Sequence, residues 1–548
     1  MRKLHWLPLI LAAGVSGLAG ARDPALKLPD IGSSAASIMS PTDQRAYGAS
    51  MLHELRSYGL VLDDPLLDDY LNTLGYRLVA HSDRPDMSFT FFIVRDSEIN
   101  AFAVPGGYIA ANAGLIVGMH REDELAAVVA HEISHITQEH TLRAFEDARK
   151  NSIPIALAML GAVIATSGRN DDSAAAAIVS GTSLMQQQQI NFTRHDEAEA
   201  DHVGIQTLAR AGFDPLAMAD AFSTLQRVMR SNGVDVPEFL RTHPVDIRRI
   251  ADAKARAVQL VDEAKRARRD NQRSDALPFP DSPLLPLARI ANATATTANS
   301  TTASAADDAG GEAYFELMRE RARVLSAGST SAVLSYYADN RRDGSAFDTP
   351  ANRYGYALAL TRAHQPGQAV DELRKLVAEQ PKSSALRLAL ADAEDQNGNG
   401  QVAHGIYDRL NSDFPGNHTI VLAYAKSLLA HGTEKDARHA VDLLRPLIGR
   451  YDDDPELQQT FGRANQLAGD KVRAAEAYAQ ATYLNGHAED ALNQLKALAK
   501  QSDLDYYQRA RVDAHITAMT PLVLELRRRD KRAAPDSLAP VLACCRHR

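Results

Sequence analysis

The sequence is poor in cysteine, which excludes one common way of holding a secreted fold together. Only two cysteines occur in 548 residues, Cys544 and Cys545, and they are neighbours near the end of the chain. Neighbouring cysteines rarely satisfy normal disulfide geometry. The fold is therefore not expected to depend on an internal disulfide framework, although an oxidising compartment would allow one.

Aromatic residues and strong net charge are scarce as well. Aromatic side chains make up only 6% of the residues, while alanine, leucine, arginine, glutamate and glutamine dominate, and this composition favours a mostly helical protein. The formal net charge of −9 gives no electrostatic footprint for nucleic acid, so no nucleic-acid partner is expected. The length is too great for one ordinary domain, and two or three are expected.

The first apolar run lies at the N-terminus. Arg2 and Lys3 precede an apolar stretch over residues 4–19, and small residues of a cleavage site follow it. This arrangement predicts a secretory signal peptide over residues 1–21. A single membrane anchor is the alternative, which the shortness of the run disfavours.

A second apolar run extends from Ile153 to Ala165. At about a dozen residues it is too short to span a bilayer. Two interpretations stay open: a helix of the core, or a hydrophobic surface that contacts a partner or the membrane.

Hydrophobic periodicity and turn residues predict a small mixed α and β region after the signal peptide. A Pro-Gly-Gly turn at residues 105–107 separates two short strands and indicates a hairpin. The expected elements are helices over residues 41–58, 64–79, 123–140 and 195–211, and strands over residues 88–94, 101–104 and 108–111.

The last two fifths of the chain are repetitive. Ala357, Ala391 and Ala425 recur every 34 residues, and so do Pro381 and Pro415. A period of 34 residues with small residues where paired helices cross is typical of tetratricopeptide repeats. An unrelated helical bundle is the alternative.

The chemistry centres on the segment His131 to His135, which reads His-Glu-Ile-Ser-His. Residues four apart share one face of a helix, so both imidazoles can reach one metal ion. Zinc is the expected metal, and Glu132 between the ligands is the expected general base for an attacking water. A purely structural zinc site is the remote alternative, which the presence of Glu132 disfavours.

A second motif lies downstream, where Glu197 and Asp201 stand four residues apart in Arg-x-x-Glu-x-x-Ala-Asp. Together the two motifs resemble the zinc peptidases that include the CAAX prenyl endopeptidase and HtpX. The resemblance implies a gluzincin-type α+β peptidase domain that binds one zinc ion per chain, with Glu197 as the third ligand beside His131 and His135. It also implies that Asp201 orients a ligating histidine.

The soluble, periplasmic branch of this family fits the chain better than its membrane-spanning members. A signal peptide, Leu28 to Gly32, Asn100 to Ala103 before the Gly-Gly turn, and C-terminal repeats carry this resemblance. It implies a periplasmic peptidase of outer-membrane protein quality control, which degrades misassembled or stalled outer-membrane proteins and binds the assembly machinery through its repeats. The cysteine pair at the C-terminus departs from the pattern.

The resulting fold class is mostly α with a small β-sheet: a gluzincin-type domain followed by an α-solenoid of tetratricopeptide repeats. The expected division is a signal peptide over 1–21, a zinc metallopeptidase domain over 22–263, a flexible linker over 264–312, the repeats over 313–530, and a tail over 531–548.

Another histidine, His243, precedes Pro244. In the soluble branch the matching histidine lies on a loop that can cover the site and coordinate the zinc. Two other roles stay open: His243 stabilises the oxyanion with Arg249 nearby, or it is a structural histidine of the turn. The remaining nearby histidines, His140, His195 and His202, are expected on the surface.

The strand over residues 101–104 is expected at a sheet edge, where an extended substrate could pair with it. A function of another class stays open as well. The chain could be chiefly a chaperone or assembly factor with a latent zinc site, because repeat solenoids present extended binding surfaces.

Overall fold

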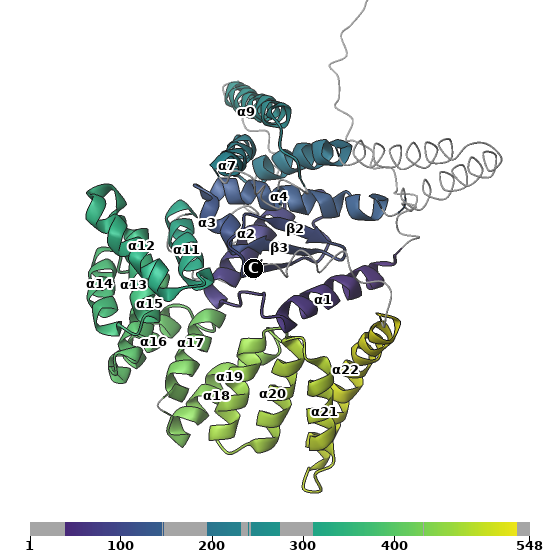
Figure 1. Cartoon of the computed structure of the whole chain (residues 1–548), viewed down its shortest axis with the longest axis vertical. Coiled ribbons are helices and arrows are strands. Elements are labelled where there is room, and N and C mark those ends of the chain that lie inside the picture. The colour runs from purple at the N-terminus through teal and green to yellow at the C-terminus, as the bar shows by residue number, and fades with distance from the viewer. Residues whose placement is uncertain are drawn as a thin grey trace, which may run out of the picture.

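The computed structural model describes residues 39–144, 146, 194–231, 239, 243–274, 311–430 and 432–533 (Figure 1). Within them, a small N-terminal α+β part is followed by helices packed in succession, which is the fold class predicted from the sequence. The predicted signal peptide, the apolar run 153–165, most of the predicted linker and both cysteines lie outside the described residues. Within the described ranges, no helix has both the length and the apolar character needed to cross a membrane.

Three strands form the sheet: β1 (Thr90–Val94), β2 (Ala101–Val104) and β3 (Tyr108–Asn112). Their order is β1-β3-β2, with β1 parallel and β2 antiparallel to β3. The predicted hairpin turn requires glycine, because Gly107 has a φ of 88° and a Cβ there would lie 2.1 Å from the Ser88 carbonyl oxygen. Because β2 stands last in the strand order, it is an edge of this sheet, as predicted.

Helix α2 (Pro65–Val79) begins where the sequence predicts. The Asp64 carboxylate accepts a hydrogen bond from the Leu67 amide at 3.1 Å, and proline occupies the first turn. The helix packs closely on β1, since a Cβ on Gly75 would lie 2.5 Å from the Phe91 ring. Helix α2 thereby covers the sheet.

Helix α4 (Glu122–Thr137) is buried along almost its whole length and contacts α2, β2 and β3. The sequence predicted that this helix would reach His140. It ends at Thr137 instead, because Glu139 adopts a left-handed φ of 56° that no regular helix accommodates. His140 then starts a new helical segment over residues 140–144.

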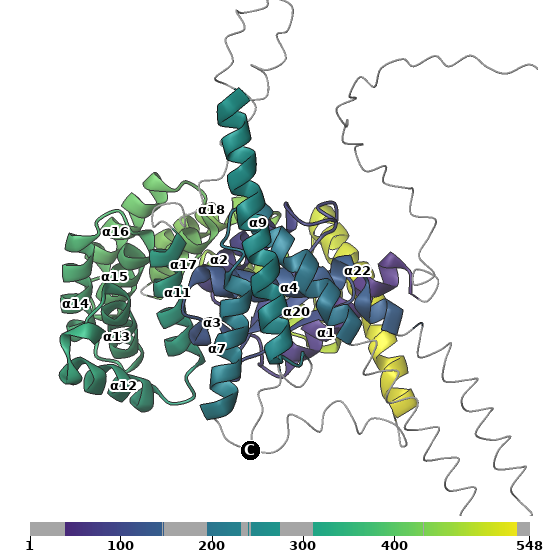
Figure 2. The ribbon, with the colours of Figure 1, turned by 90° about the horizontal axis from the view of Figure 1, so that it is seen from above.

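Two further helices pack on α4, a helix over residues 194–210 and α7 (Ala217–Ser231), and α9 (Ile247–Ser274) lies beyond them. The first of them approaches the α4 backbone at Gly204, where a Cβ would lie 3.3 Å from the backbone nitrogen of His131. Helix α9 packs on the outer side of α7 (Figure 2). It continues past residue 263, the predicted end of the domain, because the basic and polar residues that follow are themselves good helix formers.

The C-terminal helices form a row of antiparallel neighbours, each packed on the next. Alternate helices also touch one another, which makes one inner and one outer layer. The helices are α11 (Gly311–Ser326), α12 (Thr330–Asp343), α13 (Pro350–Arg362), α14 (Pro366–Glu379), α15 (Ser384–Gln396), α16 (Gly400–Asp413), α17 (His418–Ala430), α18 (Glu434–Ile448), α19 (Pro455–Leu467), α20 (Lys471–Leu484), α21 (Ala488–Ala499) and α22 (Tyr506–Ala533).

The 34-residue periodicity corresponds to equivalent buried positions in this row. Ala357, Ala391 and Ala425 are fully buried in α13, α15 and α17, where neighbouring helices meet. Glycine serves the same purpose elsewhere, since a Cβ on Gly355 would lie 2.3 Å from the Tyr337 hydroxyl. The small residues therefore mark helix crossings, as the sequence predicted.

The row of helices curves around the N-terminal part (Figure 1). Arg321 of α11 forms a bidentate ion pair with Asp64, both distances being 2.7 Å, and donates to the Tyr354 hydroxyl at 3.2 Å. The Thr419 hydroxyl of α17 donates to the Pro65 carbonyl at 3.1 Å. One continuous hydrophobic core joins the two parts.

Candidate metal centre

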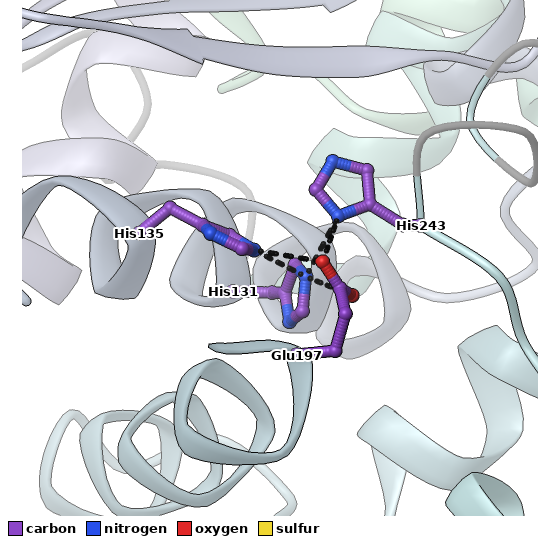
Figure 3. A group of neighbouring side chains, drawn as sticks. All are labelled: His131, His135, Glu197 and His243. Carbon is purple, nitrogen blue, oxygen red and sulfur yellow. Dashed lines mark hydrogen bonds and ion pairs between the residues drawn. The ribbon is translucent and has the colours of Figure 1, made fainter. Parts of the chain in front are cut away.

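The imidazoles of His131 and His135 project from the same side of α4 and meet at a steep angle (Figure 3). The Nε2 atoms of His131 and His135 are 3.0 Å apart, because residues four apart lie one above the other on a helix. The side chain of His131 is fully buried, and that of His135 is 11% exposed. The helix therefore presents two ring nitrogens at one point with little access to water.

Glu197 joins them from the helix over residues 194–210. Its carboxylate oxygens lie 3.4 Å from the Nε2 atoms of both His131 and His135. The close crossing at Gly204 brings this helix within reach of α4. Glu197 is buried, and although burial alone would raise its pKa, the imidazoles of His243, His131 and His135 hold that pKa well below its usual range.

His243 completes the group. Its Nδ1 atom lies 2.8 Å from Glu197 Oε1 and 3.4 Å from His131 Nε2. The ring stacks on Phe239 with centroids 4.9 Å apart, and the His243 amide donates to the Phe239 carbonyl at 2.7 Å. The ring of His243 thus lies in direct contact with two of the predicted ligands, Glu197 and His131.

This group fits a zinc ion. One ligand atom from each of His131, His135, Glu197 and His243 lies within 4.8 Å of the others. Asp201 Oδ1 lies 3.0 Å from His131 Nδ1, which favours the tautomer that carries its proton there and directs the Nε2 lone pair inward. Imidazole and carboxylate groups are common ligands of zinc, and a zinc ion would need negative charge nearby to offset its own.

The charges around His131 agree with this requirement. Burial alone would lower the pKa of His131, but the carboxylates of Asp201 and Glu197 outweigh burial and raise it to about 10. The two carboxylates therefore favour positive charge at His131.

Glu132 lies next to these ligands and is buried, with 1% of its surface exposed. Its Oε1 atom is 3.7 Å from His243 Nε2, and within the described ranges it has no hydrogen-bond partner. Burial is the main cause that raises the pKa of this carboxyl above its usual range, which makes the ionised form a better proton acceptor.

Arg249 bridges the carboxylate of the candidate ligand Glu197 and that of Asp201. Its Nε and Nη2 atoms donate to Asp201 at 2.9 and 2.8 Å, and its Nη1 atom lies 2.8 Å from Glu197 and donates to the Pro244 carbonyl at 2.9 Å. The guanidinium also lies over the Phe222 ring, 4.7 Å from its centroid. In this arrangement Arg249 is engaged with carboxylates, and a direct contact with an oxyanion would require it to leave them.

For one histidine near the centre, the predicted exposure was wrong. His140 was expected on the surface but is 3% exposed, and its Nδ1 atom lies 2.8 Å from His135 Nδ1. The end of the helix before Glu139 brings His140 there, and the spacing of residues in the sequence did not predict that end. His195 and His202 are exposed, as predicted.

Comparisons with known proteins agree with this geometry. Residues 65–257, which contain every predicted site residue, match the family described as Peptidase family M48. The chain is 30% identical over 526 residues to the beta-barrel assembly-enhancing protease of Yersinia pestis, which covers 96% of this chain and 97% of that protein. It is 29% identical over 518 residues to the protein of the same name from Escherichia coli strain K12, with 94% and 96% covered.

A shorter similarity covers only a third of this chain. It relates 33% of this chain to 50% of the mitochondrial metalloendopeptidase OMA1 of Schizosaccharomyces pombe, at 29% identity over 181 residues. The longer similarities extend through the helical repeats as well. This chain is therefore a metalloprotease that belongs to the family of the beta-barrel assembly-enhancing proteases.

Proposed function

We propose that the chain is a zinc-dependent endopeptidase of the periplasm that degrades misassembled or stalled outer-membrane proteins. The observation that carries the proposal is the convergence of His131, His135 and Glu197 beside the buried carboxylate of Glu132. The name of its relatives supports the substrate class. The signal-peptide pattern of residues 1–21 supports the compartment.

The residues divide the work of peptide hydrolysis among them. His131, His135 and Glu197 hold one zinc ion, which when bound supplies Lewis acidity that activates water and polarises the scissile carbonyl. Glu132 accepts the proton of the attacking water and delivers it to the leaving amine. Asp201 orients His131, and Arg249 offsets the negative charge of Glu197 and Asp201.

His243 keeps the resting enzyme latent in this proposal. Its Nδ1 atom lies where a fourth protein ligand would take the place of the catalytic water. The hydrogen bond from Arg249 to Pro244 helps to hold His243 there. The alternative is that His243 moves aside during the reaction and stabilises the oxyanion.

Substrate and partners would use different surfaces. An extended polypeptide pairs with the edge strand β2, since main-chain hydrogen bonding tolerates many sequences. The helices over residues 313–530 are tetratricopeptide repeats, which bind the outer-membrane assembly machinery. The N-terminal part lies within their curve, so their outer layer is the surface left for partners (Figure 1).

A second function is favoured by the position of His243. If this histidine stays on the metal, the chain acts chiefly as a chaperone or assembly factor with a latent zinc site. Its repeats would then carry the function.

The test measures bound zinc by mass spectrometry and cleavage of an unfolded porin by three proteins: wild type, Glu132→Gln and His243→Ala. One zinc per chain is expected in each. Cleavage should fall about 10²- to 10⁴-fold in Glu132→Gln, the range that a general base contributes, and rise in His243→Ala. His195→Ala, an exposed histidine, is the matched control and should match wild type.

Each contrary outcome has a definite meaning. Loss of cleavage in His243→Ala would show that His243 does not keep the enzyme latent but stabilises the oxyanion. Zinc without cleavage in every protein, together with suppression of porin aggregation by Glu132→Gln, would favour the chaperone. A wild type that binds no zinc would overturn the proposal.

A further inference from the structure

We propose that His140 is a positioning residue that fixes the orientation of the ligand His135, as Asp201 does for His131. The inference rests on the proposed zinc site. It adds to that site a second line of support, built from His140, Glu199 and Arg143.

The hydrogen bonds form an ordered chain. A His135 imidazole that offers Nε2 to a metal carries its proton on Nδ1, and this nitrogen lies 2.8 Å from His140 Nδ1. His140 Nδ1 can accept this hydrogen bond only if the proton of the His140 ring is on Nε2. That Nε2 atom lies 3.2 Å from Glu199 Oε2. The same oxygen accepts from Arg143 Nη2 at 2.7 Å. Each donor thus has one acceptor, and the tautomer of both rings is determined.

The backbone is shaped to produce this contact. In a continuous helix, a residue five positions after His135 would point to a different face. The chain instead ends α4 at Thr137 and passes through Glu139 in the left-handed region, at a φ of 56°. This conformation is unfavourable for a residue with a side chain, and it turns His140 back onto His135.

A second metal ion is the rival interpretation, since His140, Asp196 and Glu199 also place potential ligand atoms within 4.8 Å of one another. Arg143 argues against it. Its Nη2 atom lies 2.7 Å from Glu199 and 3.7 Å from Asp196, so a guanidinium already supplies the positive charge that these carboxylates require. His140 Nδ1 is directed at His135 and not into that cluster.

A histidine suits this position better than a carboxylate. Glu132, Glu197 and Asp201 already bring three carboxylates to the buried centre, with Arg249 as their counter-charge. A neutral imidazole accepts a hydrogen bond without adding another buried negative charge. Of the two carboxylates near His140 Nε2, the one that accepts its hydrogen bond, Glu199, is partly exposed, and Asp196 is 3.8 Å away.

The test compares zinc affinity, measured by competition with a chelator, in wild type and variants. His140→Phe keeps a ring but removes the acceptor, and should bind zinc about 10- to 100-fold more weakly, as is usual when the partner of a ligating histidine is lost. His140→Asn restores an acceptor near the position of Nδ1 and should recover most of the affinity. His195→Phe, an exposed histidine, is the control.

Two further measurements separate positioning from general stability. The absorption spectrum of the cobalt-substituted protein should change in His140→Phe and not in the control, because it reports ligand geometry. Thermal unfolding of the metal-free proteins should show that His140→Phe is still folded at the temperature of the zinc measurement. If His140→Phe fails to fold, Glu199→Ala gives the decision, since it removes the acceptor of His140 and should weaken zinc binding in the same direction.

The outcomes are distinct. Unchanged zinc affinity and cobalt spectrum in a folded His140→Phe, or in Glu199→Ala if the former does not fold, would overturn the positioning role. Two zinc ions per wild-type chain and one in His140→Phe would establish the second metal site instead. A wild type without zinc would overturn the proposed function itself, and with it this inference.

Discussion

At the residue scale, the candidate centre is a balance of buried charge. Glu197 and Asp201 lie one helical turn apart, and both contact the guanidinium of Arg249. Burial alone would raise the pKa of Asp201, but His131 and Arg249 outweigh burial and lower it. Asp201 therefore stays ionised and can attract the Nδ1 proton of His131 over a wide pH range.

Replacing Asp201 by asparagine tests this balance. Asp201→Asn removes the charge that faces His131 Nδ1, so zinc affinity should fall about 10- to 100-fold by chelator competition. Asp83→Asn is the matched control, because Asp83 contacts Arg210 of the same helix in an exposed ion pair at 3.0 Å. An unchanged affinity in a folded Asp201→Asn protein would contradict the role of Asp201.

At the scale of elements, the end of α4 determines where His140 lies. The helical conformation of α4 and the two histidines on one of its faces follow from local sequence, and they were predicted. Its end at Thr137 was not, because Gln138 and Glu139 are acceptable within a helix. The packing around His140, which includes Glu199 from another helix, favours the left-handed turn over continuation.

This turn can be tested at Glu139 itself. Glycine adopts a positive φ without strain and valine does not, so Glu139→Val should be less stable than Glu139→Gly by about 1–2 kcal/mol in urea unfolding. Zinc affinity should fall in the valine variant only.

His364 provides the matched control. It is the other residue besides glycine with a positive φ, 58°, in the part of the chain that the structure describes, and it lies in the turn after α13. His364→Val should lose stability relative to His364→Gly in the same way, while zinc affinity stays at the wild-type value. Equal zinc affinities in Glu139→Val and His364→Val would show that the turn does not serve the metal centre.

At the scale of the whole molecule, the two parts are joined by a buried ion pair. Asp64 caps α2 and also pairs with Arg321 of α11. Burial alone would raise the pKa of Asp64, but the charge and hydrogen bonds of Arg321 outweigh burial and lower it. One residue thus begins a helix of the N-terminal part and anchors the repeats to it.

Asp64→Asn should destabilise the protein by about 3–5 kcal/mol in urea unfolding, since it leaves Arg321 buried without its partner charge. Asparagine still caps a helix, so α2 itself should be little affected. The exposed pair of Arg438 and Glu434 is the control, and Glu434→Gln should cost less than about 1 kcal/mol. A small effect of Asp64→Asn would mean that the apolar core alone holds the parts together.

The same pair predicts a pH dependence. Because the folded pKa of Asp64 is lowered, its contribution is complete above the unfolded pKa of about 3.9 and is lost as pH falls through the lower, folded value. The difference in stability between wild type and Asp64→Asn should therefore stay constant from pH 7 to about pH 5 and narrow only below about pH 4. A difference that shrinks near neutral pH would assign the effect to another group.

Features that depend on near neighbours in the chain could be predicted from the sequence. The cap at Asp64, the Gly107 turn, the two histidines on one face of α4 and the buried alanines at a 34-residue period are all set by local conformation and periodicity. Other features depend on contacts between segments that are far apart in the chain, and the sequence did not reveal them. The contact of His243 with Glu197, the engagement of Arg249 with carboxylates and the inward turn of His140 are of this kind, because burial and charge pairing across helices outweigh local preference.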